Sequence, residues 1–359
     1  MLLIIEIGTN STKALLCEKI NDRISFIDDK VYSCRIGEGM IDSGCLSDDA
    51  INKSIDVIKQ VLNDNKEQVD LDVHIICTHA IRSAKNSTVF SEVIKQIFGF
   101  SINILSTEEE AICTSVAPIS DCLVEDMSPC PASVVPNSDC LSEDMKTEKS
   151  DSHVLILDIG GGSTELGVIN ISSTTPYPTQ SFNSFPIGAV SLKECIENKV
   201  NQNEDSEVFL KRVFETVEKY SNILRLSNCQ LSIVNFNKDG EVHLIGIGGT
   251  FVALAMIHNS LDKFSVENIE GTELHLSEIK EIWDVLFSWN SSKYSVEKIK
   301  MILKERIDIM IYGVSILLYM MKMLKIDKAR VSCKGVRHGY AMRIVGVLCT
   351  GKSLHVVPL

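Results

Sequence analysis

Residues 154–168 read VLILDIGGGSTELGV, a buried strand that ends in an acid and a glycine-rich turn and then returns to a second strand. Three glycines at positions 160–162 follow Asp158 and one apolar residue. Glycine in a turn lets another group come close to the backbone, and successive turn N–H groups make a concave site for an anion. The stretch therefore predicts a strand-turn-strand unit that holds a phosphate beside a carboxylate.

The same pattern occurs at the start of the chain, where residues 3–16 read LIIEIGTNSTKALL. One glycine-rich turn is usually just a turn, but two copies in equivalent contexts predict two related halves that face each other across a phosphate. Glu6 and Asp158 end the first strands, and such hard oxygen ligands suit Mg²⁺. The turn residues predicted to bind the phosphate are Gly8, Thr9, Asn10, Ser11, Gly160, Gly161, Gly162, Ser163 and Thr164.

Strands and helices alternate along the chain, which is typical of an α/β fold. We expect strands at 2–7, 12–17, 24–33, 73–77, 102–105, 231–236, 242–247 and 329–333. Helices are expected at 47–65, 189–199, 205–225, 251–258 and 338–349, and helices dominate 276–326. Ser47, followed by two aspartates, is a predicted N-terminal cap.

Size and composition narrow the classes of protein. The 359 residues allow two domains, and the net charge of −13 argues against binding to a nucleic-acid polymer. Twelve cysteines without a CxxC pair favour free thiols and a reducing, cytoplasmic location. The N-terminal apolar run is too short for a signal peptide. Residues 307–326 approach the length of a membrane span but carry three charges, so we expect a buried core helix, with a membrane helix as the minor alternative.

A short tandem duplication separates the two halves. Residues 115–127 and 133–145 match at ten of thirteen positions and are rich in proline, serine and acids. We interpret it as a surface insertion at a domain junction, with a regulatory or docking loop as the alternative. The predicted domains are residues 1–117 and 153–339, with the insertion at 118–152. For a terminal helix at about 340–359, packing back onto the first domain is the alternative to packing on the second.

Nine segments in order along the chain resemble the exopolyphosphatase and guanosine-pentaphosphate phosphatase family of the actin-like superfold. The resemblance implies two actin-like (ribonuclease H-like) domains facing a central cleft, in a short form without a C-terminal HD domain. The segments are IEIGTNSTK (5–13), CRIGEGMIDSGCLSDDAI (34–51), CTHAIRSAKN (77–86), STEEEAI (106–112), LDIGGGSTEL (157–166), PIGAVSLKE (186–194), IGIGGT (245–250), ERIDIM (305–310) and GVRHG (335–339).

The resemblance also implies roles for individual residues. It makes Glu110 the general base for water, with Glu109 as the fallback; from the residues alone, these acids fit a helix N-terminus equally well. Arg82 would contact phosphate. Glu165 would join Asp158 and Glu6 at Mg²⁺ or another divalent cation. Further assignments are Arg337 as a second phosphate candidate, Arg35 near distal phosphates, and His79 as a structural residue rather than a catalyst.

The implied activity is exopolyphosphatase: Mg²⁺-dependent hydrolysis of the terminal phosphate of inorganic polyphosphate, with Glu110 as base. The alternative in the same class is guanosine pentaphosphate 5′-phosphohydrolase. Alternatives of other classes are a phosphotransferase of the superfold and a non-catalytic phosphate or nucleotide sensor. A homodimer is implied by resemblance, and neither a nucleic-acid polymer nor a membrane is expected as a partner. Two departures, Glu6 for the usual Asp and Cys333–Lys334 in place of an acid, would shift metal preference or lower the rate.

Overall fold

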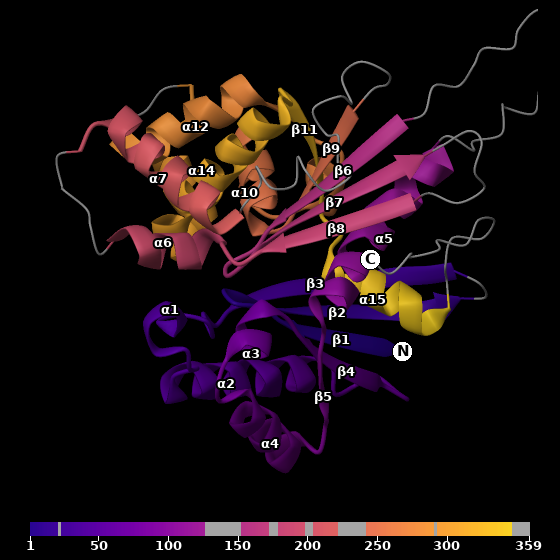
Figure 1. Cartoon of the computed structure of the whole chain (residues 1–359). Coiled ribbons are helices and arrows are strands. Elements are labelled where there is room, and N and C mark those ends of the chain that lie inside the picture. The colour runs from indigo at the N-terminus through magenta and orange to yellow at the C-terminus, as the bar shows by residue number, and fades with distance from the viewer. Residues whose placement is uncertain are drawn as a thin grey trace, which may run out of the picture.

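The computed structural model describes residues 1–20, 23–125, 152–171, 179–197, 204–221, 242–290 and 293–346. The strand expected at 231–236 and the second copy of the duplication lie outside these ranges. Two mixed β-sheets, each covered by helices, form two lobes that face each other (Figure 1). The predicted α/β fold of two actin-like lobes is therefore confirmed.

The N-terminal lobe is built on a five-stranded sheet in the order β3-β2-β1-β4-β5. β1 pairs antiparallel with β2 and parallel with β4. Strand bounds are β1 (Leu2–Ile7), β2 (Ser11–Ile20), β3 (Arg23–Ser33), β4 (Asp72–Cys77) and β5 (Ile102–Ile104). The helices of this half are α1 (Met40–Ser43), α2 (Asp48–Asp64), α3 (His79–Ser83), α4 (Ser87–Phe98) and α5 (Thr107–Glu125).

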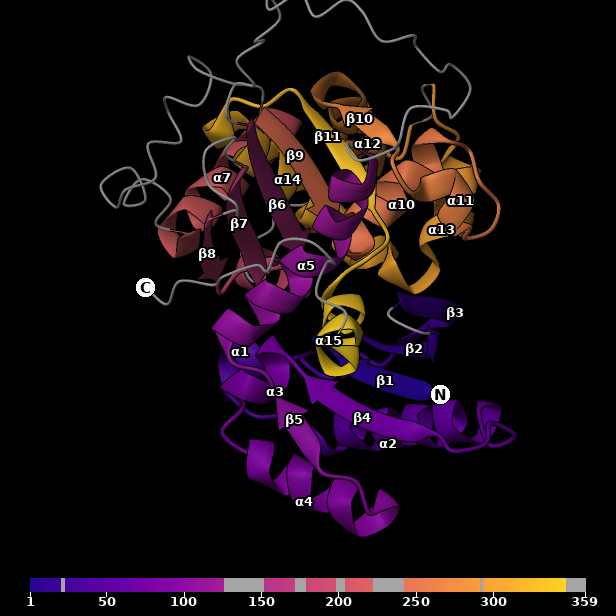
Figure 2. The ribbon, with the colours of Figure 1, turned by 90° about the vertical axis from the view of Figure 1, so that its right-hand side faces the viewer.

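Alternation along β1 decides which helix covers which face, because successive side chains of a strand point to opposite sides. Leu3 and Ile5 belong to one hydrophobic cluster with Ile55 of α2. Leu2 and Ile4 belong to another, with Val336 of α15 (Val336–Val345). The C-terminal helix α15 thus returns to the N-terminal sheet and packs between β1 and α5 (Figure 2).

The C-terminal lobe repeats the same topology in a six-stranded sheet of order β10-β11-β9-β6-β7-β8. Read from β8, the order 8-7-6-9-11 corresponds strand by strand to 3-2-1-4-5, with β10 added at the edge. The directions also agree, since β6 pairs antiparallel with β7 and parallel with β9. Bounds are β6 (Ser152–Ile159), β7 (Thr164–Ile171), β8 (Thr179–Phe185), β9 (Val242–Ile247), β10 (Glu273–His275) and β11 (Lys328–Ser332).

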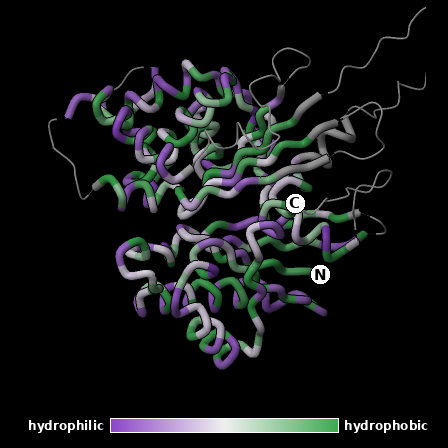
Figure 3. Tube along the Cα trace, viewed as in Figure 1, coloured by the Kyte–Doolittle hydropathy of each residue, from purple (hydrophilic) through white to green (hydrophobic). Residues whose placement is uncertain are grey.

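Apolar helices pack on this second sheet, and hydrophobic residues concentrate in the strands and the inner helices (Figure 3). α14 (Ile307–Leu324) is the predicted core helix. The helical stretch Val296–Leu324 reaches membrane-span length and hydropathy, and 72% of its 18-residue apolar window is buried inside the protein. Around it lie α6 (Ala189–Glu197), α7 (Ser206–Ser221), α10 (Gly249–His258), α11 (Val266–Ile269), α12 (Leu276–Ser288), α13 (Val296–Leu303) and the short 3-10 helix η2 (Lys304–Arg306).

Several local expectations meet the structure directly. Ser47 caps α2 as predicted, because its side chain accepts a hydrogen bond from Ala50 N at 3.2 Å. The strand β8 was not predicted. α5 continues to Glu125, into the stretch expected to be insertion, and Val116 and Ala117 pack with Met342 of α15. Seven cysteines of the described part are free thiols: Cys17, Cys34, Cys45, Cys77, Cys113, Cys195 and Cys333.

Candidate active site

The two glycine-rich turns adopt the same local geometry. Gly8 N donates to Ser11 O at 3.0 Å, and Gly160 N donates to Ser163 O at 3.0 Å. Each turn is closed by this bond and lies between two antiparallel strands, β1–β2 or β6–β7. The equivalence predicted from the sequence therefore holds at the level of backbone hydrogen bonds.

Each turn is also supported by a later segment that carries the dipeptide Ile-Gly. In the first lobe, the backbone N–H groups of Cys34 and Arg35 donate to Asn10 O, and that of Gly37 donates to Thr9 O. In the second, residues 189–191 donate to the carbonyls of Gly160 and Gly161. Gly188 has to be glycine here, because a Cβ atom would lie 2.6 Å from Gly160 O.

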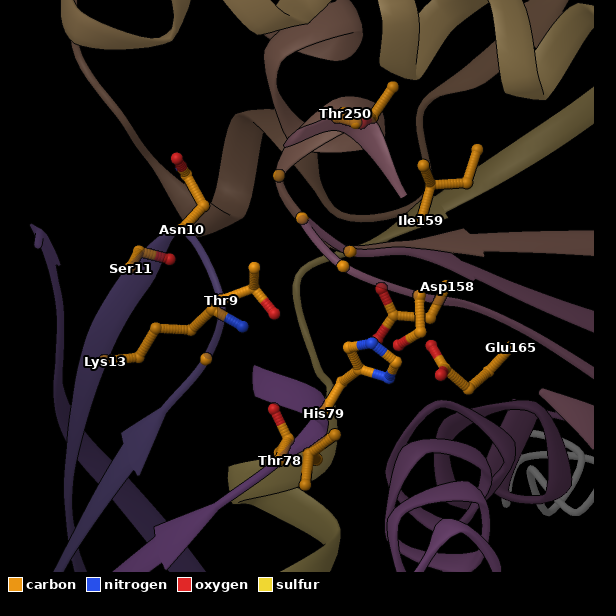
Figure 4. Close-up of a pocket in the computed structure, with 18 of the residues that line it drawn as sticks. Thr9, Asn10, Ser11, Lys13, Thr78, His79, Asp158, Ile159, Glu165 and Thr250 are labelled. Atoms are coloured by element: carbon orange, nitrogen blue, oxygen red, sulfur yellow. The ribbon is translucent and has the colours of Figure 1, made fainter. Parts of the chain in front are cut away.

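The turns face each other directly across the gap between the lobes (Figure 4). A Cβ atom on Gly161 would lie 3.1 Å from Asn10 Cβ, and one on Gly162 would lie 2.7 Å from Thr9 Oγ1. Between them is a cavity of about 90 Å³ lined by both turns. One water needs roughly 10–15 Å³ measured this way, so the cavity has room for several waters or one phosphoryl group.

Charged residues enter this cavity at matching positions of the two hairpins. Glu6 pairs with Lys13 across β1 and β2, and Asp158 pairs with Glu165 across β6 and β7. All four side chains line the cavity. The first pair is an ion pair, with Lys13 Nζ 2.7 Å from Glu6 Oε1. The second is a pair of acids, so a lysine neutralises the carboxylate in one hairpin and two carboxyl groups lie side by side in the other.

The pKa values follow from this arrangement. Burial, and then neighbouring carboxylates, raise the pKa of Glu165 well above its usual value, and the pKa of Asp158 is raised mainly by burial. Burial also acts on Glu6, but Lys13 and Arg337 outweigh it and lower the pKa of that carboxyl. Ser184 Oγ donates to Glu165 Oε1 at 2.9 Å and fixes its orientation.

Glu110 lies at the N-terminal end of α5, lines the same cavity and is only 6% exposed. Its Oε2 accepts a hydrogen bond from Arg82 Nη1 at 2.6 Å, and the same Nη1 donates to Leu105 O at 2.9 Å. Burial raises the pKa of Glu110 to about 7 against the opposing effect of Arg82. A carboxyl with such a pKa is suited to exchange a proton near neutral pH.

Glu109, the fallback for the base, has a different task. Its carboxylate accepts from Ser106 N at 2.9 Å, while Ser106 Oγ accepts from Glu109 N at 3.1 Å. This reciprocal pair is a capping box that satisfies the free N–H groups at the start of α5. The three consecutive glutamates thus divide into exposed, capping and cavity-facing positions.

Four predicted contact residues lie outside the cavity lining: Arg82, Thr164, Arg337 and Arg35, whose contacts are described below. Arg82 is absent from the lining and bonds Glu110. Thr164 is buried, and its Oγ1 donates to Ile187 O at 2.6 Å, so it braces the second turn. Arg337 makes a buried ion pair with Asp29 of β3 at 2.5 Å. The other predicted turn residues and acids all line the cavity.

The cavity also includes Lys13 and Arg306, which the sequence did not single out, and His79, which was expected to be structural. Lys13 sits at the same offset in its hairpin as Glu165 in the other, a signal that alignment of the two hairpins would have revealed. Arg306 enters from η2 and lies over the start of α10, where a Cβ atom on Gly249 would be 2.4 Å from Arg306 Nη1. His79 lines the cavity, and burial lowers its pKa to about 4, so it is neutral.

The residues fit a divalent cation in chemistry. Glu6 Oε2 is buried without a hydrogen-bond partner, although Arg337 Nη1 lies 3.6 Å from it. The adjacent acids Asp158 and Glu165 have raised pKa values that a cation would offset. No group of three possible ligands in the described ranges is arranged to enclose a metal ion. Mg²⁺ is commonly held by one or two carboxylates together with substrate phosphates, so such a pair is enough.

Comparisons of sequence assign the chain to a family. The profile of the Ppx/GppA phosphatase family matches residues 17–128 and 145–347. The chain is 26% identical over 328 residues to a bifunctional 3-dehydroquinate synthase/phosphatase of Fusobacterium nucleatum, covering 87% of this chain and 42% of that protein. It is 21% identical over 347 residues to a guanosine-5′-triphosphate,3′-diphosphate pyrophosphatase of Vibrio atlanticus, covering 95% and 58%. The chain therefore spans about half the length of these curated relatives.

Solved structures match over nearly the full chain. An exopolyphosphatase from Cytophaga hutchinsonii superposes with a TM-score of 0.73 at 19% identity, covering 98% of this chain and 99% of that one. The PPX-GPPA enzyme of Aquifex aeolicus gives a TM-score of 0.64 at 25% identity, covering 95% and 98%. The likeness to the Cytophaga structure is evidence of the shared fold alone.

Proposed function

Because the chain belongs to the Ppx/GppA phosphatase family, we propose that it is an exopolyphosphatase, which hydrolyses the terminal phosphoanhydride bond of inorganic polyphosphate. The observation that carries this proposal is the meeting of two glycine-rich turns and Glu110 in one cavity. A terminal phosphoryl group held between the turns would lie next to the carboxyl of Glu110, whose pKa of about 7 suits a base at neutral pH.

In this reaction Glu110 orients a water molecule and takes its proton. Arg82 occupies Glu110 Oε2, which fixes the carboxylate and leaves Oε1 to accept from the water. The water oxygen bonds to the terminal phosphorus as the bridging P–O bond breaks. The products are orthophosphate and a chain shorter by one phosphate. Hydrolysis of this kind depends mainly on positioning and on stabilising the phosphoryl oxygens.

Positive charge and backbone N–H groups supply that stabilisation. Arg306 and Lys13 bring cationic groups to the cavity, and the turns present their backbone to the phosphoryl oxygens. Glu6, Asp158 and Glu165 are the residues that would hold Mg²⁺, which when bound offsets charge on the phosphate oxygens. Glu6 is deprotonated because Lys13 and Arg337 lower its pKa, so it is ready to act as a ligand.

Guanosine pentaphosphate is the alternative substrate, because its terminal phosphate presents the same anhydride to the same groups. The test is phosphate release from long-chain polyphosphate and from guanosine pentaphosphate, side by side, with and without Mg²⁺. Faster turnover of polyphosphate, expressed as kcat/KM, supports the proposal. Preference for the nucleotide would assign the alternative.

Wild-type turnover, one variant and an acceptor assay test the two other classes. Glu110→Gln keeps the size of the side chain but removes the base, so an enzyme should lose turnover by about 10²- to 10⁴-fold and keep substrate binding. A sensor would show no turnover in the wild type either. A phosphotransferase would transfer phosphate from ATP to an added acceptor alcohol or carboxylate faster than to water.

A further inference from the structure

Arg35 lies between the two lobes and is held in an unusual backbone conformation. It follows β3, and its N–H donates to Asn10 O at 3.0 Å, so its backbone is tied to the first phosphate turn. Its φ of 48° lies in the left-handed region, which a non-glycine residue adopts at a cost. Such a conformation persists when surrounding contacts favour it.

The contacts of the Arg35 side chain explain that conformation. Its guanidinium crosses to the other lobe and binds Asp308 with both ends, Nη1 to Oδ2 at 2.9 Å and Nη2 to Oδ1 at 2.7 Å. Nη2 also donates to the carbonyl of Glu305. Lys193 of α6 adds a third cationic contact to Asp308, at 2.6 Å. Arg35 is therefore occupied by protein groups, and the expectation that it meets distal phosphates does not hold in this conformation.

The two anchoring points on the second lobe flank Arg306 in the chain. Glu305 precedes Arg306 in η2, and Asp308 follows it as the second residue of α14. Lys304, the residue before Glu305, has a φ of 47° in the left-handed region, so the backbone of the segment that carries Arg306 is itself strained. A short strained segment needs contacts from outside to keep one geometry.

Arg306 is the residue whose position the contacts of Arg35 with Glu305 and Asp308 fix. It lines the cavity with both turns, and burial lowers its pKa. Within the described ranges it has no acidic ion-pair partner, unlike Arg35, Arg82 and Arg337. A largely desolvated guanidinium without a partner, beside two phosphate turns, is poised for an anion.

We propose that Arg35 and Asp308 are positioning residues, an interlobe clamp that holds the segment 304–308 so that Arg306 faces the phosphoryl group. This rests on the proposed function, since it assigns Arg306 to the same phosphate. Because Arg35 belongs to the first lobe, the position of the Arg306 side chain depends on contact between the two lobes. A phosphate contact is thereby completed only when both lobes are in place.

A double-mutant cycle tests the dependence on Arg306. Arg35→Lys keeps the charge but loses the two-ended contact, and Arg306→Gln removes the phosphate contact. We expect each single variant to lower kcat/KM at least tenfold, and Arg35→Lys to cost less than about twofold in the Arg306→Gln background, because residues that act through one another are not additive. Fully additive losses would overturn the proposal.

A matched control separates local positioning from general closure of the lobes. Glu194 of α6 makes a second interlobe contact, accepting from Gly39 N at 2.7 Å and from Ile41 N at 3.3 Å, and it does not touch 304–308. Glu194→Gln should leave the effect of Arg306→Gln at full size. If Glu194→Gln abolishes that effect as Arg35→Lys does, lobe closure rather than the clamp positions Arg306.

Hydrogen exchange tests the clamp without any substrate. Backbone amides of 304–310 should exchange several-fold faster in Arg35→Lys and in Asp308→Asn than in the wild type, with α12 unchanged as the internal reference. In Glu194→Gln the faster exchange should appear at 39–43 instead. Unchanged exchange at 304–310 in a folded Arg35→Lys would refute the clamp. Failure of the wild type to release phosphate would refute only the proposed function.

Discussion

Arg82→Gln should move the pH dependence of turnover to higher pH. In the wild type the base is Glu110, with a pKa of about 7. A base acts when deprotonated, so kcat should rise with pH, reach half its plateau near that pKa, and fall to about a tenth of it one pH unit below. The Arg82 charge lowers this pKa, and its removal raises it.

The structure sets the size of the effect. Arg82 and Glu110 are 2.6 Å apart, with side chains 20% and 8% exposed, so solvent screens the pair little. A hydrogen bond to a charged group contributes about 1.5–3 kcal/mol, which corresponds to about 10- to 150-fold in the protonation equilibrium. At pH 6 the variant should therefore run about 10- to 150-fold slower than the wild type, and the gap should narrow above pH 8.

The assay is the initial rate of phosphate release at saturating polyphosphate from pH 5.5 to 9, at constant ionic strength. Arg212→Gln is the control, because Arg212 forms a similar short ion pair with Glu204, at 2.5 Å, away from the cavity. It should leave the profile in place. An Arg82→Gln profile with the wild-type midpoint, or one moved to lower pH, would refute the assignment of Glu110 as the base.

Three further predictions concern the turns, the buried charges and the metal. Gly188→Ala puts a Cβ 2.6 Å from Gly160 O, so kcat/KM should fall at least tenfold through distortion of the second turn, and a normal value would contradict the role of that turn. Arg337→Met leaves Asp29 buried without its cationic partner, with only the neutral imidazole of His338 at 3.4 Å, and should cost about 3–5 kcal/mol in urea unfolding at pH 7. Because the folded state lowers the pKa of Asp29 below its usual 3.8, that difference should shrink as pH falls through this value; a difference independent of pH would contradict the ion pair. Dialysis against EDTA should abolish phosphate release and Mg²⁺ should restore it, while full activity without added metal would remove Mg²⁺ from the proposal.

The turns and most strands were predictable because their signals are local. A run of apolar residues, an acid and glycines within about ten positions specify a strand and its turn, and the two hairpins repeat that pattern. The position of Glu110 came from resemblance. The choice between Glu110 and Glu109 as the base needed the structure, because Glu109 is bonded to Ser106 in the capping box.

The contacts of the arginines were not predictable in the same way. Arg82 meets Glu110 28 positions away, Arg35 meets Asp308 273 positions away, and Arg337 meets Asp29 308 positions away. Such pairs depend on how helices and lobes pack, and no periodicity in the sequence records them. For the same reason α5 runs through Pro118 into the expected insertion: packing of Val116 and Ala117 on α15 outweighs a composition typical of loops.

The return of α15 to the first lobe has a consequence for how the protein is made. Until residues 336–345 leave the ribosome, the β1–β2 surface that they cover, including Leu2, Ile4 and Leu15, has no permanent cover from this helix. Uncovered apolar sheet faces attract other chains. Synthesis of the early half therefore leaves this sheet face exposed, and the N-terminal lobe is completed only when α15 has been made.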